Sequence, residues 1–451
     1  MSKIPDNALR VMQLLRDGVN REALIVGGFV RDSLLGVESK DIDIEVYGMD
    51  IDSIKFVLEQ RGFRVDSVGK AFGVLKINNS IDVSVPRREN KVGVGHRGFN
   101  VVPDPSMSVK EAASRRDFTI NSMAMNIHGL IVDPFNGQSH LRLGLLVATS
   151  DAFREDPLRA MRAMQFASRF RMSMDDATIR MCRDMAPQKA ELPKERIWEE
   201  WKKWALKGQS PSLGLRLMKQ MGWLDSEIAA LIDVPQDPEW HPEGDVFVHT
   251  CHVVDAAARI ADREQLDNDD RLVLMLAALC HDFGKPSTTK MERGRLRSKG
   301  HCERGVKPAE RFLMRIGAPL AIIAQVKPLI SEHLVHAGID VPSDRAVRRL
   351  ANRIAPATVA ALGRVVEADH SGRPPLPVGN PLQVWVDRAV ELNVSGKKPQ
   401  PILMGRHLME MGMQPGREMG ALLDRAFQAQ LDGAFGEIDS AREWARGQMG
   451  S

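Results

Sequence analysis

An apolar segment that runs into a double glycine, with two spaced carboxylates beyond it, constrains this chain most. The segment ends in Gly27 and Gly28, Arg31 follows, and Asp41 and Asp43 come soon after. On a strand, residues two apart point to the same side, so Asp41 and Asp43 can hold a hard cation such as Mg²⁺ together. The glycines let the backbone approach a polyphosphate, and Arg31 can contact its phosphates. This layout suits nucleotidyl transfer, although each part alone also fits a strand followed by a surface turn.

The length and charge of the chain set its general class. A chain of 451 residues is too long for one hydrophobic core and predicts about three or four domains. The formal net charge is only +3, so the chain as a whole is not a nucleic-acid-binding polycation. Residues 154–207 nevertheless carry more Lys and Arg than Asp and Glu. Such a local positive field suits a phosphate backbone, although solvated helix faces also carry charge of this kind.

The cysteines and the apolar runs indicate the cellular compartment in which the protein folds. The four cysteines are scattered and form no Cys-x-x-Cys pair, which argues against a zinc ribbon or a disulfide framework. No apolar run approaches the roughly 20 residues that span a bilayer, and the N-terminus lacks the apolar core of a signal peptide. We therefore expect a soluble, cytoplasmic protein without a membrane partner.

Apolar periodicity divides the chain into a mixed part and a helical part. Short strands are predicted at residues 24–28, 42–47, 73–78 and 81–85. Helical periodicity dominates residues 151–235 and 245–370, with turn-rich breaks at 235–244 and 371–377. A small helical tail closes the chain.

Two further segments of the mixed part carry polar residues suited to a nucleotide site. Asp82 is a lone acid in an apolar run, and it either completes a carboxylate triad with Asp41 and Asp43 or pairs with Arg87 or Arg88. The second segment holds Arg116, Asp117 and Asn121. These side chains can bind ribose hydroxyls and phosphates, although the segment also fits an ordinary helix cap.

Asp156 and Arg159 form the most specific constellation. On a helix, residues three apart share a face. Asp accepts a hydrogen bond from an exocyclic amine, and Arg donates one to a ring nitrogen. Adenine and cytosine both present an amine beside an acceptor nitrogen, whereas guanine and uracil present the opposite order. One Asp/Arg pair can therefore accept A and C and reject G and U, or it is only a surface ion pair.

In this order, the segments resemble one known family. The motifs GGxVRDxLLG with DxD, RRDFTIN, DPFNG and EDPLRAMR are similar to those of class II tRNA nucleotidyltransferases, the CCA-adding enzymes and their poly(A) polymerase relatives. Residues 194–202 are similar to the family's neck helix, and the resemblance covers about residues 20–225.

The resemblance implies roles for individual residues. Asp41 and Asp43 would hold Mg²⁺, with Asp82 as the third candidate catalytic carboxylate. The remaining candidates bind the nucleotide: Gly27, Gly28 and Arg31 at the triphosphate, Arg116, Asp117 and Asn121 at ribose and phosphate, and Asp156, Arg159 and Arg162 at the base. Some relatives have a further Arg where this chain has Gln165, which leaves a third arginine contact open.

A second set of candidate metal ligands lies in the helical part. The apolar run 272–280 ends at His281 and Asp282, which are costly to bury unless they are paired or bind a metal. Imidazoles with carboxylates suit Ni²⁺, Mn²⁺, Fe²⁺ or Zn²⁺. Cys280 and Cys302 flank histidines and are expected to be structural. In their order, six residues resemble the ligands of two-metal HD phosphohydrolases: His249, His281, Asp282, His301, His333 and Asp369.

Together, the resemblances imply an α+β, polymerase-beta-like head followed by all-α domains. The expected domains are a nucleotidyltransferase head at 1–145, a helical neck for base selection and RNA binding at 146–235, an HD domain at 245–375 and a helical tail at 376–451.

The implied function is template-independent addition of C and A to the tRNA 3′ end from CTP and ATP. The HD ligand set also allows an accessory phosphohydrolase activity. The close alternatives are an A-adding enzyme and a poly(A) polymerase, and a more distant one is a metal phosphohydrolase with an RNA-binding head. Residues 87–110 are long and glycine-rich enough for a mobile loop, which relatives that add only CC tend to lack. The oligomeric state stays open.

Overall fold

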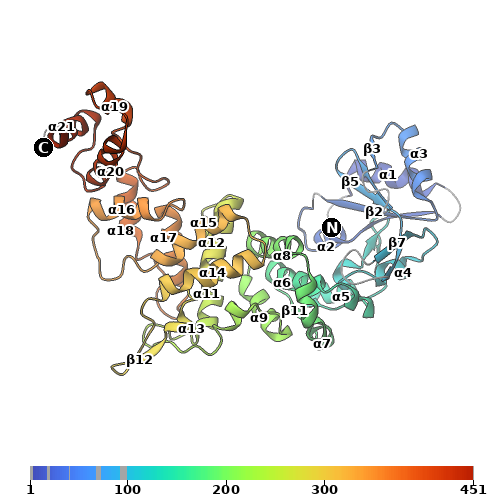
Figure 1. Ribbon diagram of the computed structural model, residues 1–451. Coiled ribbons are helices and arrows are strands. Elements are labelled where there is room, and N and C mark those ends of the chain that lie inside the picture. The colour runs from blue at the N-terminus through green and yellow to red at the C-terminus, as the bar shows by residue number, and fades with distance from the viewer. Residues whose placement is uncertain (1–3, 18–20, 40, 68–72, 92–98, 450–451) are drawn as a thin grey trace. The chain divides into compact units, whose positions relative to one another are not determined.

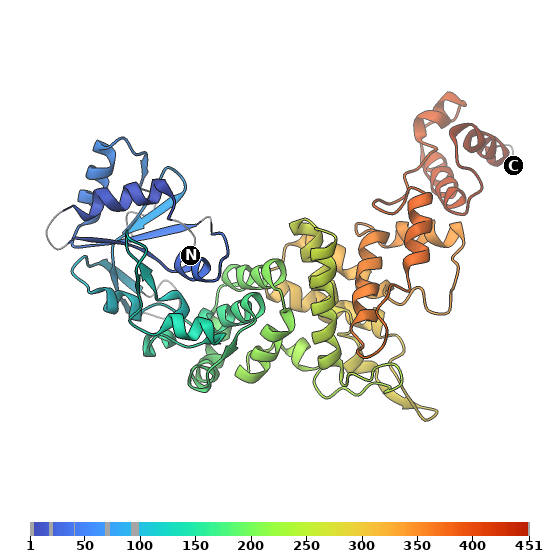
Figure 2. The same ribbon diagram turned by 180° about the vertical axis from the view of Figure 1, so that it is seen from behind.

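The computed structural model describes residues 4–17, 21–39, 41–67, 73–91 and 99–449. Contacts within the chain divide it into two compact units, residues 1–200 with 213–223, and residues 201–212 with 224–451. The first unit contains a mixed sheet and the helices that follow it, and the second unit is almost entirely helical (Figures 1 and 2). Among the described residues, no helix is both long and apolar enough to cross a membrane.

A mixed sheet forms the centre of the head. Among the described residues it has seven strands in the order β3-β4-β5-β2-β1-β8-β9. β1 pairs antiparallel with β2, and β2 pairs parallel with β5. The strands are β1 (Glu22–Val26), β2 (Ile42–Tyr47), β3 (Val65–Asp66), β4 (Val74–Ile77), β5 (Ile81–Ser84), β8 (Ala124–Met125) and β9 (Ile131–Val132). The four strands predicted from the sequence are confirmed as β1, β2, β4 and β5.

Short helices complete the head. Asp50 begins α3 because its carboxylate accepts hydrogen bonds from the backbone N–H groups of Asp52 and Ser53. Ser108 and Glu111 form a capping box at the start of α4. The helices are α1 (Asp6–Arg16), α2 (Gly28–Leu34), α3 (Ile51–Gln60), α4 (Val109–Ser114), η3 (Thr119–Asn121) and α5 (Gly137–Arg142).

The glycine-rich stretch between residues 87 and 110 is not a loop throughout. Its ends form an antiparallel pair, β6 (Arg87–Lys91) and β7 (Phe99–Pro103), before α4 begins. Residues 92–98, the centre of the predicted loop, lie outside the described residues.

Helices packed on aromatic side chains follow the head. Phe118 lies edge-on to Phe153 and Phe166, with ring centroids 5.3 and 5.8 Å apart, and all three rings are buried. A Cβ on Gly214 would lie 2.5 Å from the carbonyl O of Met164, so α9 packs closely on α6. The elements are β10 (Leu145–Leu146), η4 (Asp151–Glu155), α6 (Leu158–Phe170), β11 (Ser173–Met174), α7 (Asp176–Met185), η5 (Ala186–Glu191), α8 (Lys194–Lys207) and α9 (Pro211–Met221).

The second unit is built around α12 (Asn268–Cys280). Residues 272–280 are all buried, which requires neighbours on every side. α11 (Val246–Arg263), α15 (Leu320–Glu332) and α17 (Val359–Ser371) supply them, and α11, α12 and α17 lie together in Figure 1. The other elements are α10 (Ser226–Ala229), α13 (Lys285–Thr288), β12 (Lys290–Glu292), β13 (Arg295–Arg297), α14 (His301–Arg315), α16 (Asp344–Arg353) and α18 (Gln383–Glu391).

The tail has its own small core. Leu408, Leu422 and Phe435 pack there with partly buried methionines, which agrees with a packing role for its Leu and Met spacing. Its helices are α19 (Gly405–Glu410), α20 (Arg417–Leu431) and α21 (Ile438–Met449). The division of the whole chain into four domains stays a prediction.

Candidate functional site

The predicted head carboxylates meet beside the end of β1. In the strand register Asp43 lies opposite Val26 on one side and beside Asp82 of β5 on the other. Asp41 immediately precedes β2 and is exposed. Next to them is a cavity of about 370 Å³, whose lining includes Asp43, Asp82, Arg115 and Arg116. The structure therefore brings the two strand carboxylates and two arginines together at one cavity.

The carboxylates crowd one another. Partial desolvation raises the pKa of Asp43, and the charges of Asp82 and Asp41 add to the rise, while Arg116 opposes it. Asp82 pairs with Lys76 at 3.6 Å. A hard divalent cation would relieve this repulsion, so the residues fit the Mg²⁺ ion that the sequence predicts.

Gly27 is required where β1 turns toward this cavity. Its backbone adopts φ +73°, and an added Cβ would lie 2.9 Å from Nη1 of Arg116 and 3.9 Å from Oδ2 of Asp43. Both the conformation and the space therefore favour glycine. Gly28 then begins α2.

A buried chain of hydrogen bonds joins several predicted nucleotide-binding residues. Arg31 donates from Nη1 to Oδ1 of Asn121 at 2.5 Å and from Nε to Asp32 at 2.8 Å. Asn121 donates to Asp117 at 2.9 Å, and Arg162 donates to the other oxygen of Asp117 at 2.6 Å. Burial alone would raise the pKa of Asp117, but Arg162 and Asn121 hold it below its usual value.

Asp156 and Arg159 lie close together but use different partners. Asp156 precedes α6 with extended φ and ψ, not on the helix as the spacing predicts, because the following Pro157 disfavours a helical residue before it. Its carboxylate accepts hydrogen bonds from Nη2 and Nη1 of Arg196, at 2.8 and 3.3 Å. Arg159 donates to the carbonyl oxygens of Ala152 and Arg115 at 2.7 and 2.6 Å.

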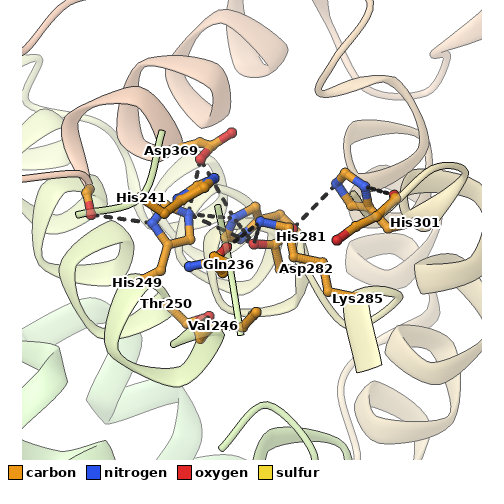
Figure 3. A network of polar contacts seen from close by, with 12 residues as sticks. Gln236, His241, Val246, His249, Thr250, His281, Asp282, Lys285, His301 and Asp369 are labelled. Carbon is orange, nitrogen blue, oxygen red and sulfur yellow. Dashed lines mark hydrogen bonds and ion pairs between the residues drawn. The ribbon is translucent and has the colours of Figure 1, made fainter. Parts of the chain in front are cut away.

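In the second unit the six predicted HD residues come together. His249 of α11, His281 at the end of α12 and Asp369 of α17 converge in Figure 3. Nε2 of His249 lies 3.1 Å from Asp369 and 3.3 Å from Nε2 of His281. A second group is formed by His301 and His333, whose Nε2 atoms are 3.2 Å apart, and Asp282 lies 3.4 Å from His301.

The histidine tautomers create a site for a cation. Nδ1 of His281, His301 and His333 each faces a backbone carbonyl oxygen three residues earlier, at 2.7 to 2.8 Å. A ring that donates from Nδ1 presents a bare lone pair at Nε2 when neutral. Burial lowers the pKa of His333 to about 4 and also lowers that of His301, which favours the neutral form of both rings. The Nε2 lone pairs of His301 and His333 therefore face each other. A metal ion bound between them would relieve the repulsion between these lone pairs.

His249 is held differently. Its Nδ1 lies 2.7 Å from Glu243. Although burial opposes protonation, Asp369 and Glu243 raise the pKa of His249 to about 9. Without a metal, a proton on Nε2 therefore supplies the positive charge next to Asp369.

A cavity of about 530 Å³ opens beside these groups. Among its lining residues are the candidate ligands Asp282, His301, His333 and Asp369. Four cationic side chains also line it: Lys285, Arg297, Lys299 and Arg373. Asp237 and Glu303 line it as well. The cationic side chains can contact the phosphate of a ligand next to the candidate metal ligands.

Several site residues escaped the sequence reasoning. Arg196 lies forty residues from Asp156 and Glu243 lies in a segment that reads as a turn-rich linker, so neither contact has a local pattern. His241 shares Glu243 with His249, at 2.9 Å. Lys285 pairs with Asp282 at 2.7 Å, and its position just after the His-Asp pair was the one available signal.

Comparison with known families agrees with this geometry. Residues 23–147 match the poly(A) polymerase head domain, residues 171–227 match the "Probable RNA and SrmB- binding site of polymerase A", and residues 246–358 match the HD domain. These matches define a nucleotidyltransferase of the poly(A) polymerase class with an HD domain.

Similar proteins of known family place the chain more specifically within this class of nucleotidyltransferases. A multifunctional CCA protein of Vibrio parahaemolyticus is 36% identical over 66% of this chain and 71% of the relative. Another, of Nitrosococcus oceani, is 34% identical over 80% of this chain and 89% of the relative. The chain belongs to the family of multifunctional CCA proteins.

Solved structures share the fold. A CCA-adding enzyme of Bacillus stearothermophilus in complex with CTP aligns with a TM-score of 0.67 and 20% identity, over 99% of this chain and 98% of that one. A Thermotoga maritima CCA-adding enzyme complexed with tRNA aligns with a TM-score of 0.61 and 18% identity, over 99% of this chain and 97% of that one. The head followed by helical domains is therefore confirmed as the fold.

Gly284 offers a test of the packing that holds His301. A Cβ at Gly284 would overlap the carbonyl oxygen of His301 and lie 2.7 Å from the backbone N of Gly305. We expect Gly284→Ala to destabilise the second unit by about 1–3 kcal/mol, measured by calorimetry. Gly420→Ala is the matched control, because nothing lies within 4 Å of its added Cβ. Equal unfolding temperatures for the two variants would contradict this view of the packing.

Proposed function

We propose that this chain adds C and A nucleotides to the 3′ end of tRNA, using CTP and ATP. The observation that carries the proposal is the meeting of Asp43 and Asp82 on neighbouring strands, beside Asp41 and at a cavity lined by Arg115 and Arg116. Membership of the multifunctional CCA family supports it, as do the CTP and tRNA complexes of the similar structures. The cytoplasm, where tRNA is processed, is the proposed place of action.

In this mechanism the head residues position the reactants. Asp41 and Asp43 would hold Mg²⁺, with Asp82 as the third carboxylate. When bound, the ion neutralises charge that develops between the tRNA 3′-hydroxyl and the α-phosphate. Gly27 leaves space for Arg116 at the cavity, and the Arg116 guanidinium can contact phosphate oxygens there.

The buried network would hold the nucleotide pocket rigid. Arg31 and Asp117 are engaged with Asn121, and Asp117 is fixed to Arg162 of α6. Preorganised groups of this kind do not have to reorient during the reaction. We propose that Arg31 and Arg162 add positive charge near the triphosphate and the base, and that Asp117 and Asn121 orient them.

We further propose that Asp156 and Arg159 select the base. Oδ1 of Asp156 accepts from Nη1 of Arg196 and from the backbone N–H of Leu158, and Oδ2 accepts from Nη2 of Arg196. Because a carboxylate oxygen accepts about two hydrogen bonds, Oδ2 is the atom that would accept from the exocyclic amine of A or C. Arg196 fixes the orientation of this carboxylate. Two backbone carbonyls fix the guanidinium of Arg159, which we propose donates to the ring nitrogen of the base.

The HD residues support a second activity, hydrolysis of phosphoesters. His249, His281 and Asp369 can hold one transition metal, and His301 and His333 a second, with Asp282 between them. When bound, such a metal polarises a phosphoryl oxygen and lowers the pKa of water. Lys285 and Arg373 line the neighbouring cavity, where they can bind the phosphate charge.

The first prediction concerns the head carboxylates. Asp41→Ala or Asp43→Ala should lower nucleotide addition by about 10³-fold or more, because transition-state charge is no longer neutralised, while tRNA binding persists. The assay offers tRNA that ends before CCA, after CC, or complete, with each labelled NTP in turn. The parent protein should extend the first two forms and leave the third unchanged.

Glu59→Ala is the control, because its side chain is half exposed in a surface pair with Lys55. Addition at the parent rate by the double Asp variant would rule out the assigned role. Extension of only the CC-ended tRNA would indicate an A-adding enzyme, and long A tails a poly(A) polymerase.

The second prediction concerns base selection. Asp156→Ala should reduce the preference for ATP and CTP over GTP and UTP by about 10- to 100-fold, because the discriminating acceptor is lost. The measurement is kcat/KM for the four nucleotides. Asp184→Ala is the control, since Asp184 also pairs with an arginine but on the surface. An unchanged preference would reduce Asp156 to the partner of Arg196.

The third prediction concerns the HD residues. Hydrolysis of 2′,3′-cyclic nucleotides or simple phosphomonoesters should appear with added Ni²⁺ or Mn²⁺, because the ligand set is complete. It should vanish in the double variant His281→Ala/Asp282→Ala and persist in Asp41→Ala. Absence of bound metal in protein purified without chelators, together with no hydrolysis, would leave this domain a structural or RNA-binding role.

A further inference from the structure

Cys302 lies among the candidate ligands of the second metal position. Its Sγ is 3.7 Å from Nε2 of His301 and 4.0 Å from Nε2 of His333. All three residues are buried, and their potential ligand atoms lie within 4.8 Å of one another. The sulfur thus faces the same point as the two bare imidazole nitrogens.

Asp282 approaches this group beside His301. Its Oδ1 lies 3.4 Å from Nε2 of His301, and its side chain is almost fully buried. Within the described part of the chain, neither carboxylate oxygen accepts a hydrogen bond, although Oδ2 has Lys285 as an ion-pair partner. Oδ2 lies 3.2 Å from His281, so the two oxygens face different groups of histidines.

The distances between these ligand atoms fit a tetrahedrally coordinated metal ion. With metal–nitrogen bonds of about 2.0 Å and a metal–sulfur bond of about 2.3 Å, tetrahedral ligand atoms lie about 3.3 Å apart for two nitrogens and about 3.5 Å apart for nitrogen and sulfur. The observed separations are 3.2 Å between the nitrogens and 3.7 and 4.0 Å from them to Sγ. Small adjustments would therefore place all these atoms around one ion.

A thiol alone does not satisfy the cluster. It carries one weak donor proton, whereas His301 and His333 both present a bare nitrogen to it. A cation accepts electron pairs from both nitrogens and from sulfur at once. The arrangement is thus better explained by coordination than by packing of a small apolar side chain.

We propose that Cys302 is a ligand of the second HD metal, together with His301, His333 and Asp282. This inference rests on the metal-binding HD site proposed above. On binding, a bond forms between Sγ and the metal, and the thiol proton passes to solvent. Because a thiolate is a soft ligand, the position favours Zn²⁺ or Co²⁺ over Mn²⁺ or Mg²⁺. Four protein ligands fill a tetrahedral site, so the open coordination position falls to the ion on His249, His281 and Asp369.

Cobalt substitution tests the sulfur bond directly. The full-length protein is freed of metal and loaded anaerobically with Co²⁺, and its absorption spectrum is recorded. We expect visible bands of tetrahedral cobalt and a near-ultraviolet thiolate-to-cobalt charge-transfer band. Cys302→Ser should lose the charge-transfer band and keep visible cobalt bands. Carboxylates in the head cannot produce the charge-transfer band, because they offer no sulfur.

Cys280→Ser is the matched control. Cys280 is also buried beside a ligand histidine in sequence, but it belongs to none of the clustered potential ligands among the described residues. Its charge-transfer band should equal that of the parent. Circular dichroism verifies that both variants fold, and Cys302→Ala repeats the test should Cys302→Ser unfold.

Metal competition gives an independent measurement. Cys302→Ser should lower the preference for Zn²⁺ over Mn²⁺ by about tenfold or more at one of two bound ions. Visible cobalt bands without a charge-transfer band, or a band that persists in Cys302→Ser, would overturn the role of Cys302 and leave the HD metal site standing. Failure to bind any metal would instead overturn the proposed HD site itself.

Discussion

The ion pair between the buried Asp117 and the partly exposed Arg162 connects the parts of the head site. An ionised carboxylate inside a protein is tolerated only when charge and hydrogen bonds compensate for lost water. Arg162 supplies the charge, and Asn121 and the backbone N–H of Phe118 supply the hydrogen bonds. Asn121 in turn accepts from Arg31, so the segment after Gly28 and the helix after Pro157 are fixed to one carboxylate. The nucleotide residues thus depend on one another for their positions.

The two proposed metal centres differ in the chemistry of their ligands. The proposed ligands in the head are the carboxylates of Asp41, Asp43 and Asp82, on or beside the paired strands β2 and β5. Oxygen ligands of this kind suit a hard ion that exchanges water readily. The HD centre offers imidazoles from helix ends in a buried setting, which suits a tightly held transition metal. The ligand chemistry therefore favours a different kind of ion at each proposed centre.

Much of the fold was predictable because its signals are local. The strands around Gly27 and Asp43 and the apolar helix before His281 follow from periodicity and from breaker residues. Contacts across the chain were not predictable. The register that places Asp82 beside Asp43 depends on strand pairing, and the approach of Arg196 to Asp156 depends on how α8 packs. Pro157 also shifted Asp156 off the helix, which a three-residue spacing does not reveal.

Two histidines of the HD centre, His281 and His333, also end helices. His281 follows α12 and His333 follows α15, and each ring donates to a carbonyl oxygen in the last turn of its own helix. Carbonyl oxygens in the last turn of a helix generally have no N–H partner within the helix, and helix ends fray first. When a metal ligand also caps a helix end, binding of the metal reduces the fraying of that helix end. Occupancy of the centre would therefore slow the exchange of amide hydrogens at two helix ends, even with no change in the average structure.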